Sequence, residues 1–241
     1  MANFSAQNYL ACARAENKVV EHAYLRRKAQ RASVGQIACL QAKSAVGIDG
    51  SQVVITFDDA YADTLHAADL LGRFNLPATW FVVSSAMVGQ CTWFNEEGPK
   101  GPTLLGHQLR HLAQCGMEIG GDSRTHRRMA QIQVSELTSE TIQCKSEIED
   151  ALGCVITSFS YPYGNYDELV VQATIEAGFE RACTTENGIA RIDTEKFKLR
   201  RVGITANDTI SDFARKMLIL NDHPGAKGVF DSTRRIIGYR G

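Results

Sequence analysis

The sequence predicts an α/β protein in which helices cover a parallel β-sheet. Two apolar runs, Val53–Phe57 and Ala78–Val83, have the length and composition of buried strands in such a sheet. The segment between them, from Ala62 to Gly72, has its apolar residues at helical spacing. A strand, a helix and a strand in so short a stretch predict a right-handed βαβ unit with parallel strands.

The alternation of strands and helices continues to residue 218. The predicted helices are 104–115, 135–152, 168–177 and 210–218, and the predicted strands are 117–120, 156–160, 181–185 and 198–204. About five or six βα units result, and these fit either an open doubly wound sheet or a closed barrel. Periodicity alone does not choose between the two.

Residues 1–46 differ from the rest in composition. Ala, Leu, Arg, Lys, Glu and Gln dominate, and no glycine occurs before Gly35, which predicts one or two helices. We therefore expect a helical extension over 1–46 and the main domain over 47–241. Helices packed on the outside of that domain are suited to a homo-oligomer contact.

Bulk composition narrows the class of protein. With 241 residues, of which 44% are hydrophobic, the chain suits one globular domain with a sizeable core. A net charge of −1 without a basic run argues against nucleic acid and anionic membranes as main partners. No apolar stretch reaches the length of about 18 residues expected of a membrane span. The first residues lack a signal-peptide pattern, and the seven cysteines lack a Cys-x-x-Cys motif, so we expect reduced thiols and a cytoplasmic location.

Two adjacent carboxylates, Asp58 and Asp59, follow the first buried strand. In α/β folds the carboxyl ends of the strands are where ligands and catalytic groups collect. Neighbouring carboxylates repel each other unless they share a cation or a proton. The alternative is that the pair caps the next helix and supplies its first-turn charge.

A second polar group, Asp122 and His126, follows the predicted strand 117–120. Together with Asp59 it offers two carboxylates and an imidazole, a set that suits zinc or another divalent transition metal. An Asp-x-x-x-His pair on its own is more often a pair of solvated surface residues.

Several ordered motifs together give a resemblance to a known family. They are Thr56–Asp59, Pro77–Val82, Glu118–Gly120 with the following His126, Phe159–Gly164 and Leu199–Ile204. In this order they resemble the polysaccharide deacetylases, that is, the NodB-homology domain or carbohydrate esterase family four. The resemblance covers roughly residues 52–220, and it implies a distorted (β/α) barrel of about seven parallel strands with the site at the strand carboxyl ends.

The resemblance also implies roles for individual residues. Asp58 matches the general base, Asp59 and His126 match metal ligands, and the backbone N–H of Tyr163 matches an oxyanion donor. His223 is the candidate general acid by position. The implied cofactor is a divalent metal, zinc first, with cobalt or nickel as alternatives. The implied substrate is an N-acetylated amino sugar, from which acetate is released.

This sequence departs from the family pattern in two places. Asp122 stands where the family has a histidine ligand; an aspartate can hold the metal, but its added charge makes the ion a poorer Lewis acid. Ser160 and Tyr161 stand where the family often has an arginine that orients the base, and Arg200 or Arg201 is a candidate replacement. The candidate substrate-contacting residues are Tyr161, Pro162, Arg201 and Trp93.

Two other functions stay open from the sequence. One is a catalytically weakened or inactive member of the same fold that binds a glycan or a protein partner, because Asp122 replaces the usual ligand. The other is a hydrolase of a small amide or cyclic imide on the same barrel, which the absence of a signal-peptide pattern favours.

Overall fold

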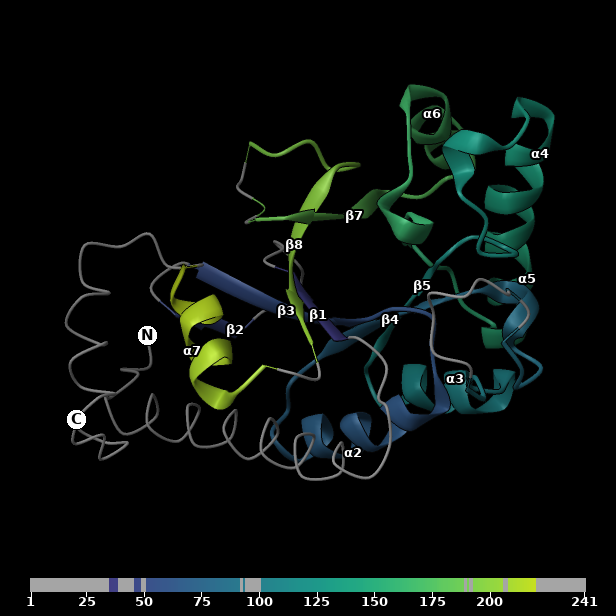
Figure 1. Ribbon diagram of the computed structural model, residues 1–241. Helices are drawn as coiled ribbons and strands as arrows, with labels where there is room; N and C mark the ends of the chain where they lie inside the picture. Colours follow the sequence, from purple (N-terminus) through teal and green to yellow (C-terminus); the bar gives the residue numbers. More distant parts are fainter. Residues whose placement is uncertain are drawn as a thin grey trace, which may run out of the picture. The chain divides into compact units, whose positions relative to one another are not determined.

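The computed structural model describes residues 35–38, 46–48, 51–91, 93, 101–188, 190, 193–205 and 208–219 (Figure 1). The chain divides into two compact units, Met1–Asn207 and Asp208–Gly241. Within the second unit the described residues form helix α7 (Ile210–Ile219), as the sequence predicts. The sheet and the other helices belong to the first unit.

Six parallel strands in chain order form the main sheet, which confirms the predicted α/β class. They are β3 (Ser51–Phe57), β4 (Ala78–Val82), β5 (Glu118–Gly121), β6 (Ser158–Ser160), β7 (Arg181–Asn187) and β8 (Leu199–Ile204). Because each strand pairs with the next one in the chain, all six carboxyl ends lie at the same edge of the sheet.

Strand β1 (Gly35–Ala38) closes the curled sheet into a distorted barrel. It pairs antiparallel with both β3 and β8, so that Gly35 lies opposite Phe57 on one side and Ile204 on the other. The short β2 (Val46–Ile48) pairs antiparallel with the start of β3. The barrel prediction is confirmed, although the parallel strands number six and the strand that closes the barrel is antiparallel.

The predicted helical extension is wrong at residues 35–38, which form β1. Pairing with β3 and β8 removes two exposed sheet edges, a tertiary gain that overrides local helix propensity. Residues 1–34 and 39–45 of the predicted extension lie outside the described residues, and the division of the chain at residue 47 stays a prediction.

Helices lie where the sequence predicts them. They are α2 (Leu65–Arg73), α3 (Gly106–Gln114), α4 (Val134–Thr138), α5 (Cys144–Leu152) and α6 (Glu168–Glu176). A π-helical turn, η4 (Ser139–Gln143), joins α4 to α5, so the predicted helix 135–152 is continuous but distorted in the middle. Figure 1 shows α3 and α5 side by side next to β5, in agreement with their contacts.

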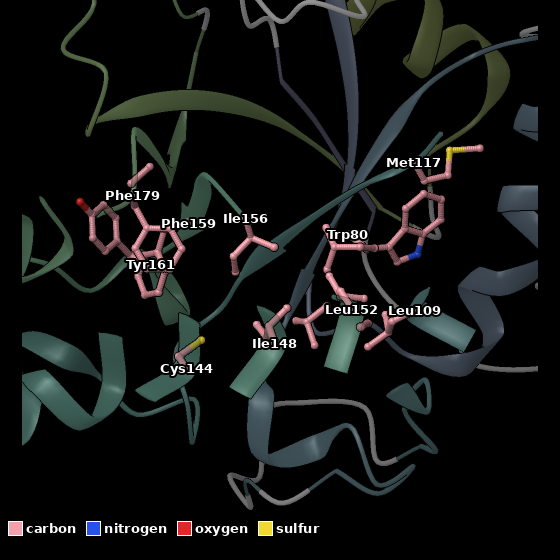
Figure 2. Close-up of a cluster of buried hydrophobic side chains, with 14 of the residues drawn as sticks. Trp80, Leu109, Met117, Cys144, Ile148, Leu152, Ile156, Phe159, Tyr161 and Phe179 are labelled. Atoms are coloured by element: carbon pink, nitrogen blue, oxygen red, sulfur yellow. The ribbon is translucent and has the colours of Figure 1, made fainter. Parts of the chain in front are cut away.

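One large apolar cluster fills the space between the sheet and these helices. Trp80 on β4 and Phe159 on β6 are fully buried, and Leu109, Ile148 and other helix residues belong to the same cluster (Figure 2). Removing this much apolar surface from water is the main source of stability for the fold. The core therefore fixes the strands whose carboxyl ends carry the polar residues described below.

None of the helices in the described part of the chain has both the length and the apolar character needed to cross a membrane.

Gly120 on β5 provides a test of this packing. A Cβ added there would lie 2.7 Å from a ring carbon of Phe81 and 2.8 Å from the Ser158 carbonyl oxygen. We predict that Gly120→Ala lowers the free energy of unfolding by about 1–3 kcal/mol, since a backbone oxygen cannot move aside cheaply. Thermal or urea unfolding measures this.

Gly72→Ala is the matched control. Gly72 lies within α2, and a Cβ there meets nothing within 4 Å, so alanine should stabilise the helix by about 0.5–1 kcal/mol. Equal stability of the Gly120→Ala and wild-type proteins would contradict the close packing of β4, β5 and β6.

Candidate functional site

Polar side chains from three strands or the loops that follow them meet at the carboxyl edge of the sheet. Asp58 and Asp59 follow β3, Asp122 follows β5, and Arg201 lies on β8. His126 comes from the same loop as Asp122. The parallel topology thus brings together residues that are far apart in the sequence.

Arg201 holds Asp58 through two hydrogen bonds. Its Nη1 lies 2.7 Å from Asp58 Oδ1, and its Nη2 lies 3.1 Å from Oδ2. The arginine side chain is 1% exposed, while that of Asp58 is 18% exposed. Such a two-pronged ion pair fixes both the position and the rotation of the carboxylate.

The other donors of Arg201 are also used. Nη1 donates to Thr56 Oγ1 (3.1 Å), Nη2 donates to Ser160 Oγ (3.1 Å), and Nε donates to the Thr184 carbonyl (2.9 Å). Since all five N–H groups have partners in the protein, Arg201 is placed to orient Asp58 and not to contact a substrate. The sequence offers two roles for Arg201, which are to orient the base and to contact the substrate. The structure supports the first.

Asp59, Asp122 and His126 converge on one point. One potential ligand atom from each lies within 4.8 Å of the others. His126 Nε2 is 3.0 Å from Asp59 Oδ1, and His126 Nδ1 is 3.1 Å from the Tyr163 hydroxyl. The Tyr163 contact fixes the ring so that Nε2 faces the two carboxylates, as in many metal sites.

The Asp122 carboxylate is suited to a bound cation. It is 2% exposed, and its Oδ1 has no hydrogen-bond partner among the described residues. A buried carboxylate oxygen without a partner is costly, and a cation removes that cost. Two carboxylates and an imidazole form a donor set for a divalent transition metal, so these three residues fit the predicted cofactor.

The close approach of these groups shifts their pKa values. Burial raises the pKa of the Asp122 carboxyl; the His126 charge opposes this, Asp59 adds to it, and the result lies well above the usual range. Burial lowers the pKa of the His126 imidazole, but the hydrogen bond with Asp59 and the charge of Asp122 outweigh it, so that pKa is raised. A cation that binds here therefore competes with protons for these groups.

The loops around the site adopt left-handed backbone conformations that non-glycine residues rarely take. Asp59, Ser123, His126 and Tyr163 have φ values between 57° and 65°. Such residues cost about 1–3 kcal/mol each and persist only where the surrounding structure holds them.

Glu140 is one of the groups that hold these loops. It is 4% exposed, and its Oε2 accepts hydrogen bonds from the backbone N–H groups of Arg124 (3.1 Å) and Thr125 (2.9 Å). Its Oε1 accepts one from the Thr125 hydroxyl (2.5 Å), and Ser123 Oγ accepts one from the His126 N–H (2.9 Å). The sequence analysis missed Glu140; a carboxylate on the apolar face of a predicted helix is the signal that would have found it.

Of the remaining candidate residues, Tyr161 and Pro162 are buried, and Trp93 lies beside His126. Tyr161 is 1% exposed and donates to the Phe197 carbonyl (3.0 Å), and Pro162 is also buried, so neither presents its side chain to a substrate. The Trp93 ring lies 4.8 Å from the His126 ring. His223 lies outside the described residues.

An open pocket of about 420 Å³ adjoins His126. The rings of Trp93 and Tyr163 form part of its wall, together with Arg127 and Arg128. Its size and its aromatic lining residues are typical of small-ligand sites. Of the three converging residues, His126 lines this pocket.

Residues 47–182, more than half of the chain, match the sequence profile of the family described as polysaccharide deacetylase. The chain is 28% identical over 162 residues to YxkH of Bacillus subtilis, a protein assigned as a polysaccharide deacetylase, across 67% of this chain and 54% of that protein. It is 22% identical over 171 residues to the peptidoglycan-N-acetylglucosamine deacetylase PgdA of Listeria monocytogenes, across 70% of this chain and 32% of PgdA. The chain therefore spans about half the length of YxkH and about a third of PgdA.

Solved structures show the same fold. IcaB from Ammonifex degensii superposes with a TM-score of 0.61 at 19% identity, covering 84% of this chain and 88% of that chain. The deacetylase PplD from Streptococcus pyogenes, in complex with acetate, superposes with a TM-score of 0.58 at 22% identity, covering 82% and 77%. At these identities the likeness concerns the fold.

The raised pKa values predict a pH-dependent metal affinity. The pKa values of His126 and Asp122 are both raised in the protein without metal. Zinc therefore competes with protons for these side chains. The zinc affinity should fall by about tenfold per pH unit for each displaced proton as the pH drops through the raised pKa of His126. Calorimetry in buffers of different protonation enthalpy counts the released protons.

His107→Ala, which removes an exposed histidine, is the control and should leave both affinity and proton release unchanged. A zinc affinity that does not change with pH around neutrality would show that His126 is not a ligand.

Glu140→Ala should lower the free energy of unfolding by about 3 kcal/mol and weaken metal binding, since two backbone N–H groups lose their acceptor. Glu140→Gln keeps an acceptor for both amides and should lose less. Glu176→Ala, at an exposed helix position, is the control for removing a glutamate. Thermal unfolding and zinc titration of the three variants test this. Wild-type stability and wild-type zinc affinity in Glu140→Ala would contradict the claim that Glu140 holds the loop in place.

Proposed function

Because the chain belongs to the polysaccharide deacetylase family, we propose that it is a divalent-metal-dependent hydrolase that removes the acetyl group from an N-acetylated amino sugar. The observation that carries this proposal is the convergence of Asp59, Asp122 and His126 beside a carboxylate, Asp58, that Arg201 holds in place. This arrangement supplies a cation site and a base at the carboxyl edge of one barrel.

Asp59, Asp122 and His126 would hold the ion, with zinc as the first candidate and cobalt or nickel as alternatives. When bound, a divalent ion supplies a Lewis acid that polarises the acetyl carbonyl and makes water more acidic. The Asp122 carboxylate adds negative charge where the family has a neutral imidazole, which strengthens the hold on the cation and weakens its Lewis acidity.

Asp58 is suited to act as the general base. Its carboxylate is partly exposed, and the hydrogen bonds from Arg201 leave each oxygen with further acceptor capacity. A base that is held in one orientation meets the attacking water in the geometry that proton transfer needs. Asp58 would remove a proton from that water as it attacks the acetyl carbon.

Tyr163 is suited to stabilise the oxyanion that forms. It lies in the tight turn η5 (Pro162–Gly164) with φ at 57°, and its side chain packs edge-on against His126. A backbone N–H aimed at the developing negative charge is worth about 3 kcal/mol. His223 stays the predicted general acid, which would protonate the leaving nitrogen so that acetate and a free amine result.

The pocket beside His126 suits a sugar ring. The aromatic residues Trp93 and Tyr163 line it, and its volume of about 420 Å³ is within the range of small-ligand sites. The name of PgdA, peptidoglycan-N-acetylglucosamine deacetylase, makes N-acetylglucosamine units the first substrates to test on this chain. A cytoplasmic location and a homo-oligomer stay predictions from the sequence.

A catalytically weakened protein that binds a glycan is the second candidate, favoured by the aspartate at position 122. The wild-type protein loaded with zinc separates the two. Acetate release from N-acetylglucosamine oligosaccharides supports the enzyme, whereas tight binding without acetate release supports the second candidate.

Asp58→Asn should lower kcat by about 10²–10⁴-fold while the metal content stays at the wild-type level, because the base is lost and the ligands are not. Metal analysis and an acetate assay on N-acetylated chito-oligosaccharides measure both quantities. Asp63→Asn, at an exposed position of the following turn, is the matched control and should keep wild-type activity.

Wild-type turnover by Asp58→Asn would show that another group is the base. Loss of metal in that variant would show that Asp58 is a ligand. Removal of the metal with a chelator should abolish acetate release, and added zinc should restore it.

A further inference from the structure

A tyrosine hydroxyl close to the candidate metal centre is buried without a hydrogen-bond partner. Tyr61 is 4% exposed, and its hydroxyl has no partner among the described residues. Asp122 Oδ1 is the other buried side-chain oxygen with this property in the described part of the chain, and Asp122 belongs to the candidate metal centre. Burying a hydroxyl unpaired is costly, and such groups in native proteins are few, so a functional role is one reason to keep this one.

The backbone around Tyr61 is held firmly. The Ala60 carbonyl accepts a hydrogen bond from the Leu104 N–H (2.8 Å). The Tyr61 carbonyl accepts from both the N–H (3.0 Å) and the hydroxyl (2.6 Å) of Thr64. The chain is therefore fixed before and after the ring, and the close packing around a buried ring confines its hydroxyl to one place.

The Tyr61 hydroxyl lies on the Asp59 side of the metal centre. Asp59 and Ala60 both have left-handed backbone, with φ values of 65° and 49°, so the chain turns sharply between the carboxylate and the ring. The Trp93 ring neighbours both sides, with its centroid 6.1 Å from that of Tyr61 and 4.8 Å from that of His126. Burial raises the pKa of the Tyr61 hydroxyl, and the charge of Asp59 adds to the rise. The hydroxyl therefore keeps its proton and can donate it in a hydrogen bond.

The Cys91 thiol is another neighbour of this hydroxyl, and it also raises the pKa of Tyr61. Its Sγ lies 3.3 Å from the Trp93 carbonyl, to which the thiol can donate. Sulfur is a weak hydrogen-bond acceptor, whereas a carboxylate oxygen is a strong one. Of the two neighbours, Asp59 is therefore the better partner for the phenol hydroxyl.

Asp59 needs a new donor when a cation binds. In the metal-free structure His126 Nε2 lies 3.0 Å from Asp59 Oδ1, a distance at which a protonated Nε2 donates to that oxygen. Nε2 cannot donate a hydrogen bond and bind a cation at the same time, so a bound cation removes this bond. A carboxylate that gives one oxygen to a metal keeps a second oxygen for a hydrogen bond, and that bond fixes its orientation.

We propose that Tyr61 is a positioning residue of the metal centre, whose hydroxyl donates a hydrogen bond to Asp59 when Asp59 binds the cation. This inference rests on the cation site of the proposed function and adds a residue to it. The hydroxyl is unpaired in the metal-free protein and paired in the metal-bound protein. It therefore favours metal binding without stabilising the metal-free fold.

Tyr61→Phe tests this proposal because it removes the hydroxyl and keeps the ring. The zinc affinity of the full chain, measured by competition with a chelator, should fall by about tenfold or more, as for other partners that orient metal ligands. The melting temperature of the metal-free protein should not fall, since no hydrogen bond is lost there. A hydroxyl with a merely structural role would give the reverse, a lower melting temperature with an unchanged zinc affinity.

Tyr161→Phe is the matched control. Tyr161 is 1% exposed, but its hydroxyl donates to the Phe197 carbonyl (3.0 Å). Loss of this hydrogen bond should lower the melting temperature by about 2–4 °C and leave the zinc affinity unchanged. Cys91→Ala should also keep the wild-type zinc affinity. A loss equal to that of Tyr61→Phe would assign the effect to the thiol and overturn the proposal.

The outcomes separate this proposal from the proposed function. Wild-type zinc affinity in Tyr61→Phe overturns the role of Tyr61 and leaves the deacetylase proposal standing. The role is also overturned if that variant keeps its zinc affinity but loses turnover, because the hydroxyl then acts on the substrate. If the wild-type protein binds zinc but releases no acetate, the deacetylase proposal fails and the zinc affinities still decide on Tyr61. A wild-type protein that binds no zinc overturns both.

Discussion

The buried ion pair between Arg201 and Asp58 is the constraint on which the rest of the site depends. A guanidinium at 1% exposure is tolerable only if every N–H has a partner, and its partners come from β3, the residue after β3, β6 and β7. Arg201 therefore does two things. It joins four strands of the barrel at their carboxyl ends, and it fixes the orientation of a carboxylate that reaches solvent. The geometry of the strands and the geometry of Asp58 cannot change independently.

The second group at this edge is built differently, because two carboxylates lie close together and share a single imidazole. Asp122 is buried with an oxygen that has no partner among the described residues, and it shares a small space with Asp59 and His126. Left-handed backbone at Asp59, Ser123 and His126 brings these groups together, and Glu140 holds the loop that carries two of them. Backbone strain is typical of functional sites, and a divalent cation bound here would relieve the repulsion between the two carboxylates.

Much of the fold could be predicted from the sequence because buried parallel strands leave a strong local signal. The apolar run before Asp58 and the short motifs around Asp122 and Tyr163 predict a candidate site at the carboxyl ends of the strands, and the structure brings these segments together there. Strand β1 could not be predicted, since its pairing with β3 and β8 is non-local and overrides a helix-favouring composition. The direction in which individual side chains point could not be predicted either. Tyr161 directly follows β6, but its side chain is buried in the core. Glu140 lies in a helical segment, but its side chain points inward and accepts hydrogen bonds from the loop at Thr125.

The central claim is that Asp59, Asp122 and His126 bind one divalent ion, and anomalous diffraction at the zinc edge tests it most directly. Crystals grown with zinc should show one strong peak between the three side chains, with oxygen and nitrogen ligands at about 2.0–2.2 Å. A zinc-loaded crystal with no peak there, or with its ordered zinc bound by other residues, would contradict the account.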